Sequence, residues 1–158
     1  MFHSKENSFP LYCYTNNPHN IHFNNNDILV IKPELKWDST LNYITKYTSA
    51  MVTSTQHWTY GRFEIRAALP VGKMLRTDIR LESAQSYGNT PKGRIDIVNE
   101  IQTAHIFYGI QIGYPAHYKP FYESHTALNL QHYHTYTVDW NETHIQWFFD
   151  KNHLHSLA

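Results

Sequence analysis

Hydrophobic and polar residues alternate in short runs along this chain, and the clearest run lies between Gly61 and Leu69. Within it, charged residues alternate with apolar ones: Arg62, Glu64 and Arg66 against Phe63, Ile65 and Ala67. A period of two places one side of a strand in water and the other side against a core. Runs with helical spacing are hard to find. The pattern therefore predicts an all-β protein.

Further strands are predicted where β-branched and aromatic residues lie between clusters of Asn, Gly, Pro and Asp. The Asn-rich segment 24–27 is expected to form a turn that joins strands at 21–23 and 28–32 into a hairpin. The other predicted strands are Tyr43–Thr55, Gly61–Leu69, Met74–Leu81, Arg94–Ile101, Ile106–Ile112, Thr135–Trp140 and Ile145–Phe149. No linker, repeat or second domain is visible, so we predict one domain over residues 1–158.

Charge and cysteine content narrow the class of protein. Lys plus Arg and Asp plus Glu number 13 each, and the formal net charge is zero. A nucleic-acid binder would show a basic excess or stripe, so we predict no nucleic-acid partner. No apolar run approaches the roughly 20 residues that span a bilayer. The single cysteine, Cys13, excludes an internal disulfide, and the N-terminus lacks the features of a secretory signal.

Aromatic residues make up 15% of the chain, with 12 Tyr, 8 Phe and 4 Trp. Rings of this kind stack on the apolar faces of sugars, and Trp58, Tyr87, Tyr108 and Tyr114 are candidate contacts to a glycan. The alternative for each ring is ordinary packing on a pleated, half-buried sheet.

Two segments in a fixed order resemble a known family: Tyr60–Pro70 followed by Gly72-Lys73, and the strand Gly93–Glu100. They are similar to the family-16 glycoside hydrolases, in the laminarinase-like and β-1,3-glucan-recognition branch. Tyr47–Ala50 and the pair Tyr136–Trp140 and Trp147–Asp150 extend the resemblance. It implies an antiparallel, concanavalin-like β-jelly-roll sandwich. Because the last strands of the family have no counterpart after Ala158, we expect an incomplete sandwich.

The resemblance also implies a catalytic strand, which reads Glu-Ile-Asp-Ile/Val-x-Glu in the family. The same frame here contains Arg94, Asp96 and Asn99 at the positions of the nucleophile, the helper Asp and the acid/base. Retaining hydrolysis requires two carboxyl groups roughly 5–5.5 Å apart. A guanidinium stays protonated and an amide does not act as an acid or base. We therefore predict an impaired site in which Arg94 and Asp96 form an ion pair.

Glu100 offers an alternative if the strand runs without the bulge that the family resemblance implies. In a regular strand, Asp96, Val98 and Glu100 share one face, and the two carboxyl groups can approach to roughly 7 Å, within the range of inverting enzymes. Asp96 and Glu100 are therefore the candidate catalytic residues if hydrolysis persists. The other interpretation of Glu100 is a solvated or ion-paired strand residue.

The segment Leu75–Leu81 differs from the tryptophan-containing segment that the family usually has there. Arg76 and Arg80 occupy the expected tryptophan positions, and both are candidate substrate-binding residues. With Arg94, Asp78 and Asp96 they are expected to form an ion-paired cluster. The cluster indicates either an anionic glycan ligand or drift after loss of function.

Histidines and small motifs complete the candidate chemistry. His125, His132 and His134 lie close together in the sequence, but no cysteine or carboxylate pattern completes a metal site, so we predict no metal and no cofactor. Asn141-Glu142-Thr143 matches an N-glycosylation acceptor, which matters only in a secretory route.

Three functions stay open at this point: glycan binding or pattern recognition without catalysis, residual hydrolysis, and a truncated, inactive product. The family resemblance implies a β-glucan-type polysaccharide partner and an extracellular location, and the oligomeric state is not predicted.

Overall fold

A computed structural model describes residues 12–38, 43–72, 75–84, 92–101, 105–113, 119–127 and 129–158. The regular elements in these residues are all strands, which confirms the all-β prediction. The chain divides into two compact units, residues 1–56 and 57–158, which are described separately below. Whether the two units make a single domain stays a prediction.

The described residues of the first unit form five short strands. β1 (Tyr12–Tyr14), β5 (Tyr43–Ser49) and β4 (Glu34–Asp38) form one sheet in that order, and β1 is parallel to β5. β2 (Ile21–Phe23) and β3 (Leu29–Ile31) form the predicted hairpin. Its turn is held by the side chain of Asn24, whose Oδ1 accepts hydrogen bonds from the backbone of Asn26 and Ile28 at 2.9 and 3.1 Å. Asn therefore forms this turn because its side chain replaces a backbone acceptor.

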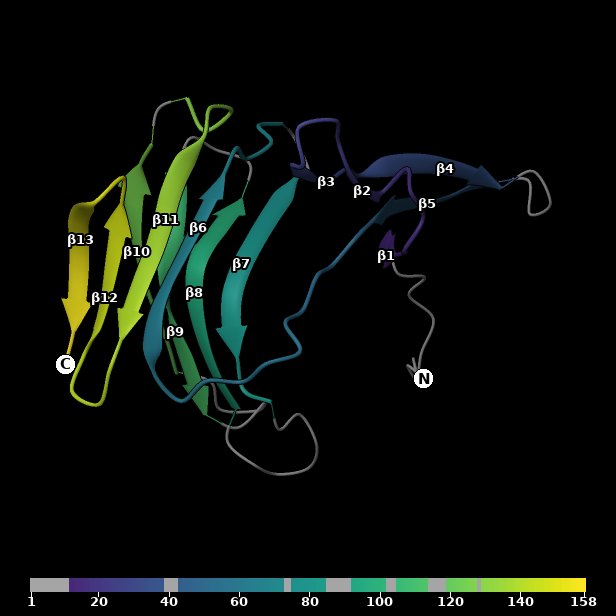
Figure 1. The fold of residues 1–158 in the computed structure, drawn as a ribbon. Coiled ribbons are helices and arrows are strands. Elements are labelled where there is room, and N and C mark those ends of the chain that lie inside the picture. Colours follow the sequence, from purple (N-terminus) through teal and green to yellow (C-terminus); the bar gives the residue numbers. More distant parts are fainter. Residues whose placement is uncertain are drawn as a thin grey trace. The chain divides into compact units, whose positions relative to one another are not determined.

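The second unit contains two antiparallel four-stranded sheets (Figure 1). One sheet has the order β10-β9-β8-β7 and the other the order β13-β12-β11-β6. The strands are β6 (Gly61–Ala67), β7 (Arg76–Glu82), β8 (Lys92–Ile101), β9 (His105–Gly113), β10 (Lys119–Thr126), β11 (His134–Trp140), β12 (Ile145–Phe149) and β13 (Asn152–Leu157).

The core of the second unit contains apolar side chains of both sheets. Tyr136, Val138 and Trp147 from one sheet join a single buried cluster with Ile95 and Val98 from the other. Burial of a large apolar side chain contributes about 1.5–3 kcal/mol, so this cluster is the main source of stability for the unit. The ring nitrogen of Trp147 also donates to the backbone carbonyl of Asp96 at 2.9 Å, which ties the two sheets together directly behind the candidate site.

A β-bulge interrupts β8 at the candidate catalytic segment. Ile79 pairs with Val98, but the next residue of β7, Arg80, pairs with Asp96, so Ile97 is an extra residue in β8. A bulge reverses the side to which the following side chains point. Asp96 and Asn99, three residues apart, therefore face the same side of the sheet. The regular strand on which the pairing of Asp96 with Glu100 depended is not formed.

Most predicted strands agree with the structure to within a few residues, but the predicted strand Tyr43–Thr55 ends at Ser49. Residues 51–60 are exposed and contain no strand. Four strands were not predicted: β1, β4, β10 and β13. They are short or lack a clean alternation, and the strongest signal for a strand in sequence is that alternation. No helix able to cross a membrane occurs among the described residues.

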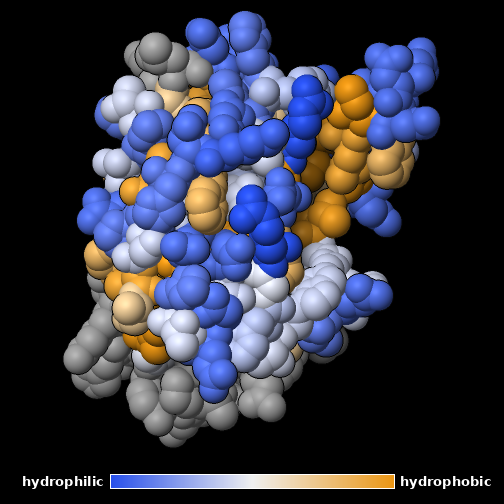
Figure 2. Space-filling model, turned by 60° about the vertical axis from the view of Figure 1, so that its left-hand side comes forward, coloured by the Kyte–Doolittle hydropathy of each residue, from blue (hydrophilic) through white to orange (hydrophobic). Residues whose placement is uncertain are grey.

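Figure 2 shows a face of the molecule on which hydrophilic residues dominate. On β6, the charged positions 62, 64 and 66 are exposed and the apolar positions between them are partly buried. The alternation seen in the sequence thus corresponds to a wet outer face and a core face, as predicted.

Candidate functional site

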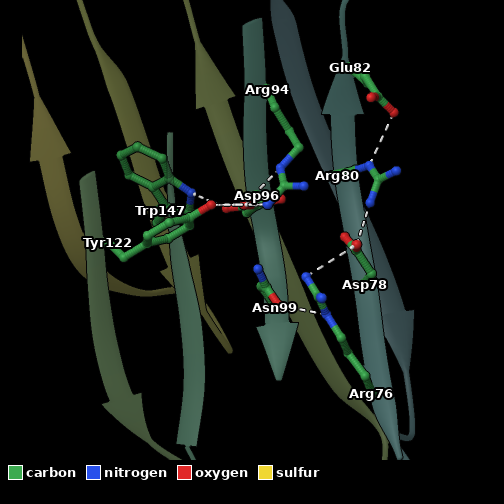
Figure 3. A network of polar contacts seen from close by, with 9 residues as sticks. All are labelled: Arg76, Asp78, Arg80, Glu82, Arg94, Asp96, Asn99, Tyr122 and Trp147. Atoms are coloured by element: carbon green, nitrogen blue, oxygen red, sulfur yellow. Dashed lines mark hydrogen bonds and ion pairs between the residues drawn. The ribbon is translucent and has the colours of Figure 1, made fainter. Parts of the chain in front are cut away.

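Asp96 lies at the centre of the candidate site and is completely buried. Its Oδ2 accepts hydrogen bonds from Arg94 Nε at 3.1 Å, from Arg94 Nη2 at 2.8 Å and from the Tyr122 hydroxyl at 2.9 Å. The same Nη2 of Arg94 donates to the Tyr122 oxygen at 2.9 Å, which closes a three-membered network (Figure 3). The predicted ion pair of Arg94 and Asp96 is therefore present, with a tyrosine that the sequence did not indicate.

The register of the sheet explains how Tyr122 reaches Asp96 from a strand that is not its neighbour. Asp96 pairs with Gly109 on β9, and Gly109 pairs with Tyr122 on β10. A Cβ atom at Gly109 would lie 2.0 Å from the backbone oxygen of Phe121, a distance at which atoms overlap. Glycine at position 109 permits the close approach of β10, and it leaves no side chain between the tyrosine and the carboxylate.

A second polar network continues along β7. Arg76 Nε donates to Asn99 Oδ1 at 3.1 Å, and Arg76 also lies 3.7 Å from the carboxylate of Asp78. Arg80 forms ion pairs with both Asp78 and Glu82, the latter at 3.1 Å. Figure 3 shows these side chains on the same side of the sheet as Arg94 and Asp96. Most of the predicted ion-paired cluster is therefore confirmed, with Glu82 as an additional member.

The charges of this network compensate one another. Burial opposes the charge of the Arg94 guanidinium, but the carboxylate of Asp96 outweighs that effect and raises the pKa of Arg94 above its ordinary value. Arg80 behaves in the same way, since Asp78 and Glu82 outweigh the effect of burial and raise its pKa. Burial, and then the hydrogen bond to Asp96, raise the pKa of Tyr122, which stays protonated as a donor. The network thus contains three arginines and three carboxylates: Arg76, Arg80 and Arg94 with Asp78, Glu82 and Asp96.

This geometry has a direct chemical consequence. A nucleophile in retaining hydrolysis must present a free carboxylate oxygen to an anomeric carbon. Oδ2 of Asp96 already accepts from two side chains, and its Oδ1 is buried and has no hydrogen-bond partner among the described residues. Asn99 is 7% exposed and its amide oxygen is bound by Arg76. In the described part of the strand, the Asp96 carboxylate and the Asn99 amide oxygen are therefore both bound by neighbouring side chains.

The other candidate residues lie in different surroundings. Trp58 is 51% exposed and contacts Phe63 edge-on, with ring centroids 5.6 Å apart. Tyr108 is only 5% exposed and packs against Trp147 in the core, which leaves its ring little surface for a ligand. Tyr87 and Tyr114 lie outside the described residues. The backbone of Glu100 pairs with Thr77, whereas Asn99 pairs with Asp78, and the Glu100 side chain is not described.

Sequence reasoning missed Tyr122, Glu82 and the contact of Trp147 with β8. Glu82 could have been predicted from the sequence, because Asp78, Arg80 and Glu82 are charged residues at alternate positions of one strand. Tyr122 could not have been, since it is 26 positions from Asp96 in the chain and sits on a strand without alternation.

Two of the three histidines considered as metal ligands, His134 and His125, have other side-chain contacts. His134 Nδ1 lies 2.6 Å from Oδ2 of Asp150, and its ring stacks on Phe149 at 4.8 Å. The ring of His125 also contacts Phe149, at 5.5 Å. The rings of His125 and His134 therefore both pack against Phe149.

Comparison with known proteins gives a consistent result. The family profile described as Glycosyl hydrolases family 16 matches residues 12–158. A glucan endo-1,3-beta-glucosidase of Cryptopygus antarcticus is 28% identical over 155 residues, which cover 92% of this chain and 57% of the relative. A beta-glucanase of Rhodothermus marinus is 30% identical over 123 residues, which cover 66% of this chain and 41% of the relative. The chain thus spans about half the length of these curated relatives.

Solved structures show the same fold. The laminarinase from Rhodothermus marinus superimposes with a TM-score of 0.76 at 25% identity, over 92% of this chain and 61% of that one. The sandwich described above is therefore the β-jelly roll that the sequence motifs implied. Because the family profile covers nearly the whole chain and the fold agrees, this protein belongs to family 16 of the glycosyl hydrolases.

Proposed function

We propose that this chain binds a β-1,3-glucan-type polysaccharide through a glycoside-hydrolase-like domain whose catalytic site is impaired. The observation that carries the proposal is the Arg94–Asp96–Tyr122 network, which stands where the family resemblance expects the nucleophile and its helper. A glucan as ligand is supported by the names of the two curated relatives, a glucan endo-1,3-beta-glucosidase and a beta-glucanase.

The charge balance of the cluster favours a neutral glycan over an anionic one. Arg76, Arg80 and Arg94 all have carboxylate or amide partners within the network. A sulfate or uronic acid would have to displace those partners, which costs the ion pairs already formed. Neutral hydroxyl groups instead form hydrogen bonds to exposed parts of the network without breaking it. Binding is accordingly expected to depend little on salt concentration.

Hydrolysis of glucan is the second candidate function, because both curated relatives are named as enzymes that act on glucans. Asp96 is the proposed carboxylate in that case. Its predicted pairing with Glu100 rested on a regular strand, which the bulge at Ile97 interrupts. Family members are commonly secreted, and we propose an extracellular location for either function. A chain without either activity is the third candidate, and it predicts broad, non-cooperative unfolding.

The deciding experiment measures reducing-sugar release from laminarin by the folded protein and by the double variant Arg94→Glu, Asn99→Glu. We expect no release by the unchanged protein and measurable release by the double variant, since the variant regains two carboxyl groups. The matched control is Arg94→Gln, Asn99→Gln, which changes the same positions without adding a carboxylate. Near-UV circular dichroism of each variant establishes that it is folded.

Each other outcome points to a different candidate. Release by the unchanged protein that disappears in Asp96→Asn or Glu100→Gln would overturn the proposal and establish hydrolysis. Absence of release from every folded variant, together with no saturable binding of laminarin in calorimetry, would overturn glucan binding as well. Saturable binding without release by the unchanged protein is the result that the proposal requires.

A further inference from the structure

The turn between β11 and β12 carries the only Asn-x-Ser/Thr triplet without proline in the 158-residue sequence, Asn141-Glu142-Thr143. The turn lies between Trp140 and Ile145, which are the last paired residues of the hairpin. Glu142 and Thr143 are exposed and Asn141 is half-buried. The triplet therefore lies at the tip of a hairpin, where an added group meets solvent.

The side chains of this turn form a closed ring of hydrogen bonds. Oδ1 of Asn141 accepts from the Thr143 hydroxyl at 3.0 Å, and Nδ2 of Asn141 lies 2.9 Å from Nε2 of His144. Nδ1 of His144 lies 3.0 Å from the Thr143 oxygen. An amide nitrogen only donates, so Nε2 accepts and Nδ1–H donates to the threonine. Each hydrogen bond in the ring then has one donor and one acceptor.

The backbone of the turn depends on the same asparagine. Oδ1 of Asn141 also accepts from the backbone nitrogens of Thr143 at 2.9 Å and His144 at 3.1 Å. The backbone nitrogen of Asn141 donates to the carbonyl of His144 at 3.0 Å. The carbonyl oxygen of the side chain is therefore fully engaged, whereas its amide nitrogen uses only one of two protons in the ring.

We propose that Asn141 is an acceptor for an N-linked oligosaccharide. The donor class is a lipid-linked oligosaccharide diphosphate. Nδ2 of Asn141 forms a bond to the anomeric carbon of the first sugar, the bond from that carbon to the diphosphate oxygen breaks, and the lipid diphosphate leaves with the electron pair. Nδ2 gives up one proton to a base of the transferring enzyme, and no oxidation or reduction occurs.

The folded turn retains its hydrogen bonds in the product. The secondary amide keeps one N–H, which suffices for the bond to His144, and the three bonds accepted by Oδ1 do not involve the reacting atom. The turn belongs to the sheet β13-β12-β11-β6, whereas the polar network around Asp96 belongs to the sheet β10-β9-β8-β7. The modification is therefore separate from the proposed glucan site and does not depend on that function.

The test expresses the full chain behind a cleavable secretion signal in a eukaryotic cell and digests medium and cell extract with peptide N-glycosidase. We expect a mobility shift on digestion and conversion of Asn141 to Asp, which mass spectrometry detects in heavy-oxygen water. Asn141→Gln and Thr143→Val abolish the shift, and Thr143→Ser retains it. Because no second acceptor triplet exists in the sequence, the loss in Asn141→Gln is complete.

A positive control makes a negative result decisive. Gln131→Thr in the Asn141→Gln background creates a new acceptor triplet that begins at Asn129, and positions 129 and 131 are both exposed. If that variant is modified while the unchanged protein is not, the chain has met the transferring enzyme and Asn141 is no acceptor, which overturns the proposal. If neither is modified although removal of the secretion signal shows that the chain entered the compartment, Asn141 is no acceptor there, and the proposal is equally overturned.

Discussion

At the scale of single residues, Asp96 has the most demanding environment in the described structure. An unpaired buried carboxylate costs several kcal/mol, so its charge requires partners. Arg94 and Tyr122 supply them through Oδ2 alone. The Tyr122 hydroxyl is thus a hydrogen-bond partner of a buried carboxylate, and it can be removed without altering the charge of the site.

We predict that Tyr122→Phe lowers the free energy of unfolding by about 1–2 kcal/mol, because Oδ2 of Asp96 loses a donor in a buried position. Chemical denaturation followed by tryptophan fluorescence measures the change. Tyr133→Phe is the matched control, since Tyr133 is 43% exposed and its ring contact with Arg66 survives the substitution. Equal stability of the two variants would show that the Tyr122 hydroxyl does not support the buried carboxylate.

At the scale of elements, the β12–β13 hairpin has the most constrained turn. Its two turn residues, Asp150 and Lys151, have φ values of 47° and 71° between the paired residues Phe149 and Asn152. Positive φ at both positions defines a turn that suits the twist of a hairpin and strongly favours glycine at the second position. A lysine there has backbone strain that the flanking pairs of β12 and β13 must offset.

We predict that Lys151→Gly raises the stability of the protein by about 0.5–1 kcal/mol, because glycine adopts positive φ without a steric penalty. The midpoint of thermal unfolding is the measurement. Lys151→Ala serves as the control, since it removes the same charge and retains the Cβ atom. A gain in the alanine variant equal to that in the glycine variant would assign the effect to charge.

Asp150 links the same turn to β11, and this makes the hairpin sensitive to pH. Burial raises the pKa of its carboxyl group, but hydrogen bonds from the Thr135 backbone and from His134 outweigh burial and lower that pKa below its ordinary value. The unfolded chain therefore takes up a proton at a higher pH than the folded chain. The contribution of Asp150 is present above about pH 4, the ordinary range of Asp, and is lost as pH falls through the lowered value.

We predict that the difference in unfolding free energy between the unchanged protein and Asp150→Asn narrows as pH falls from about 6 to about 3. Asparagine keeps an acceptor for the Thr135 backbone, so the comparison isolates the charge. Urea denaturation at several pH values measures it. A difference that stays constant across this range would contradict the assigned cause.

At the scale of the whole molecule, the two compact units meet in sequence at position 56. Residues 51–60 are exposed throughout and form no strand. Backbone that is exposed and lacks ladder hydrogen bonds opens at low free energy cost, and proteases cleave such segments first.

We predict that brief digestion with proteinase K cleaves early within residues 51–56 and yields a product that begins near residue 57. The reason is the exposure of this segment compared with the two paired sheets that follow it. N-terminal sequencing of the early products gives the cleavage position. The prediction fails if the first cuts fall within β6 to β9 while residues 51–56 stay intact.

The sequence alone determined the fold class, the hairpin at 21–31 and most strands of the second unit. Polar and apolar residues alternate in a strand with one solvent-exposed face and one core face, so β6 can be predicted from its own residues. The family motifs were equally local, since each is contiguous. They also placed Arg94 and Asp96 two positions apart on one strand. Side chains at this spacing share a face, so the ion pair does not depend on other segments of the chain.

Only the tertiary structure decided how the candidate site is completed. The bulge at Ile97 arises from the register with β7, and it turns Asn99 to the side of Asp96. Tyr122 reaches Asp96 only because Gly109 lies between them on β9. Register and close approach depend on neighbouring strands that are distant in the chain, and no local pattern of apolar and polar residues encodes them.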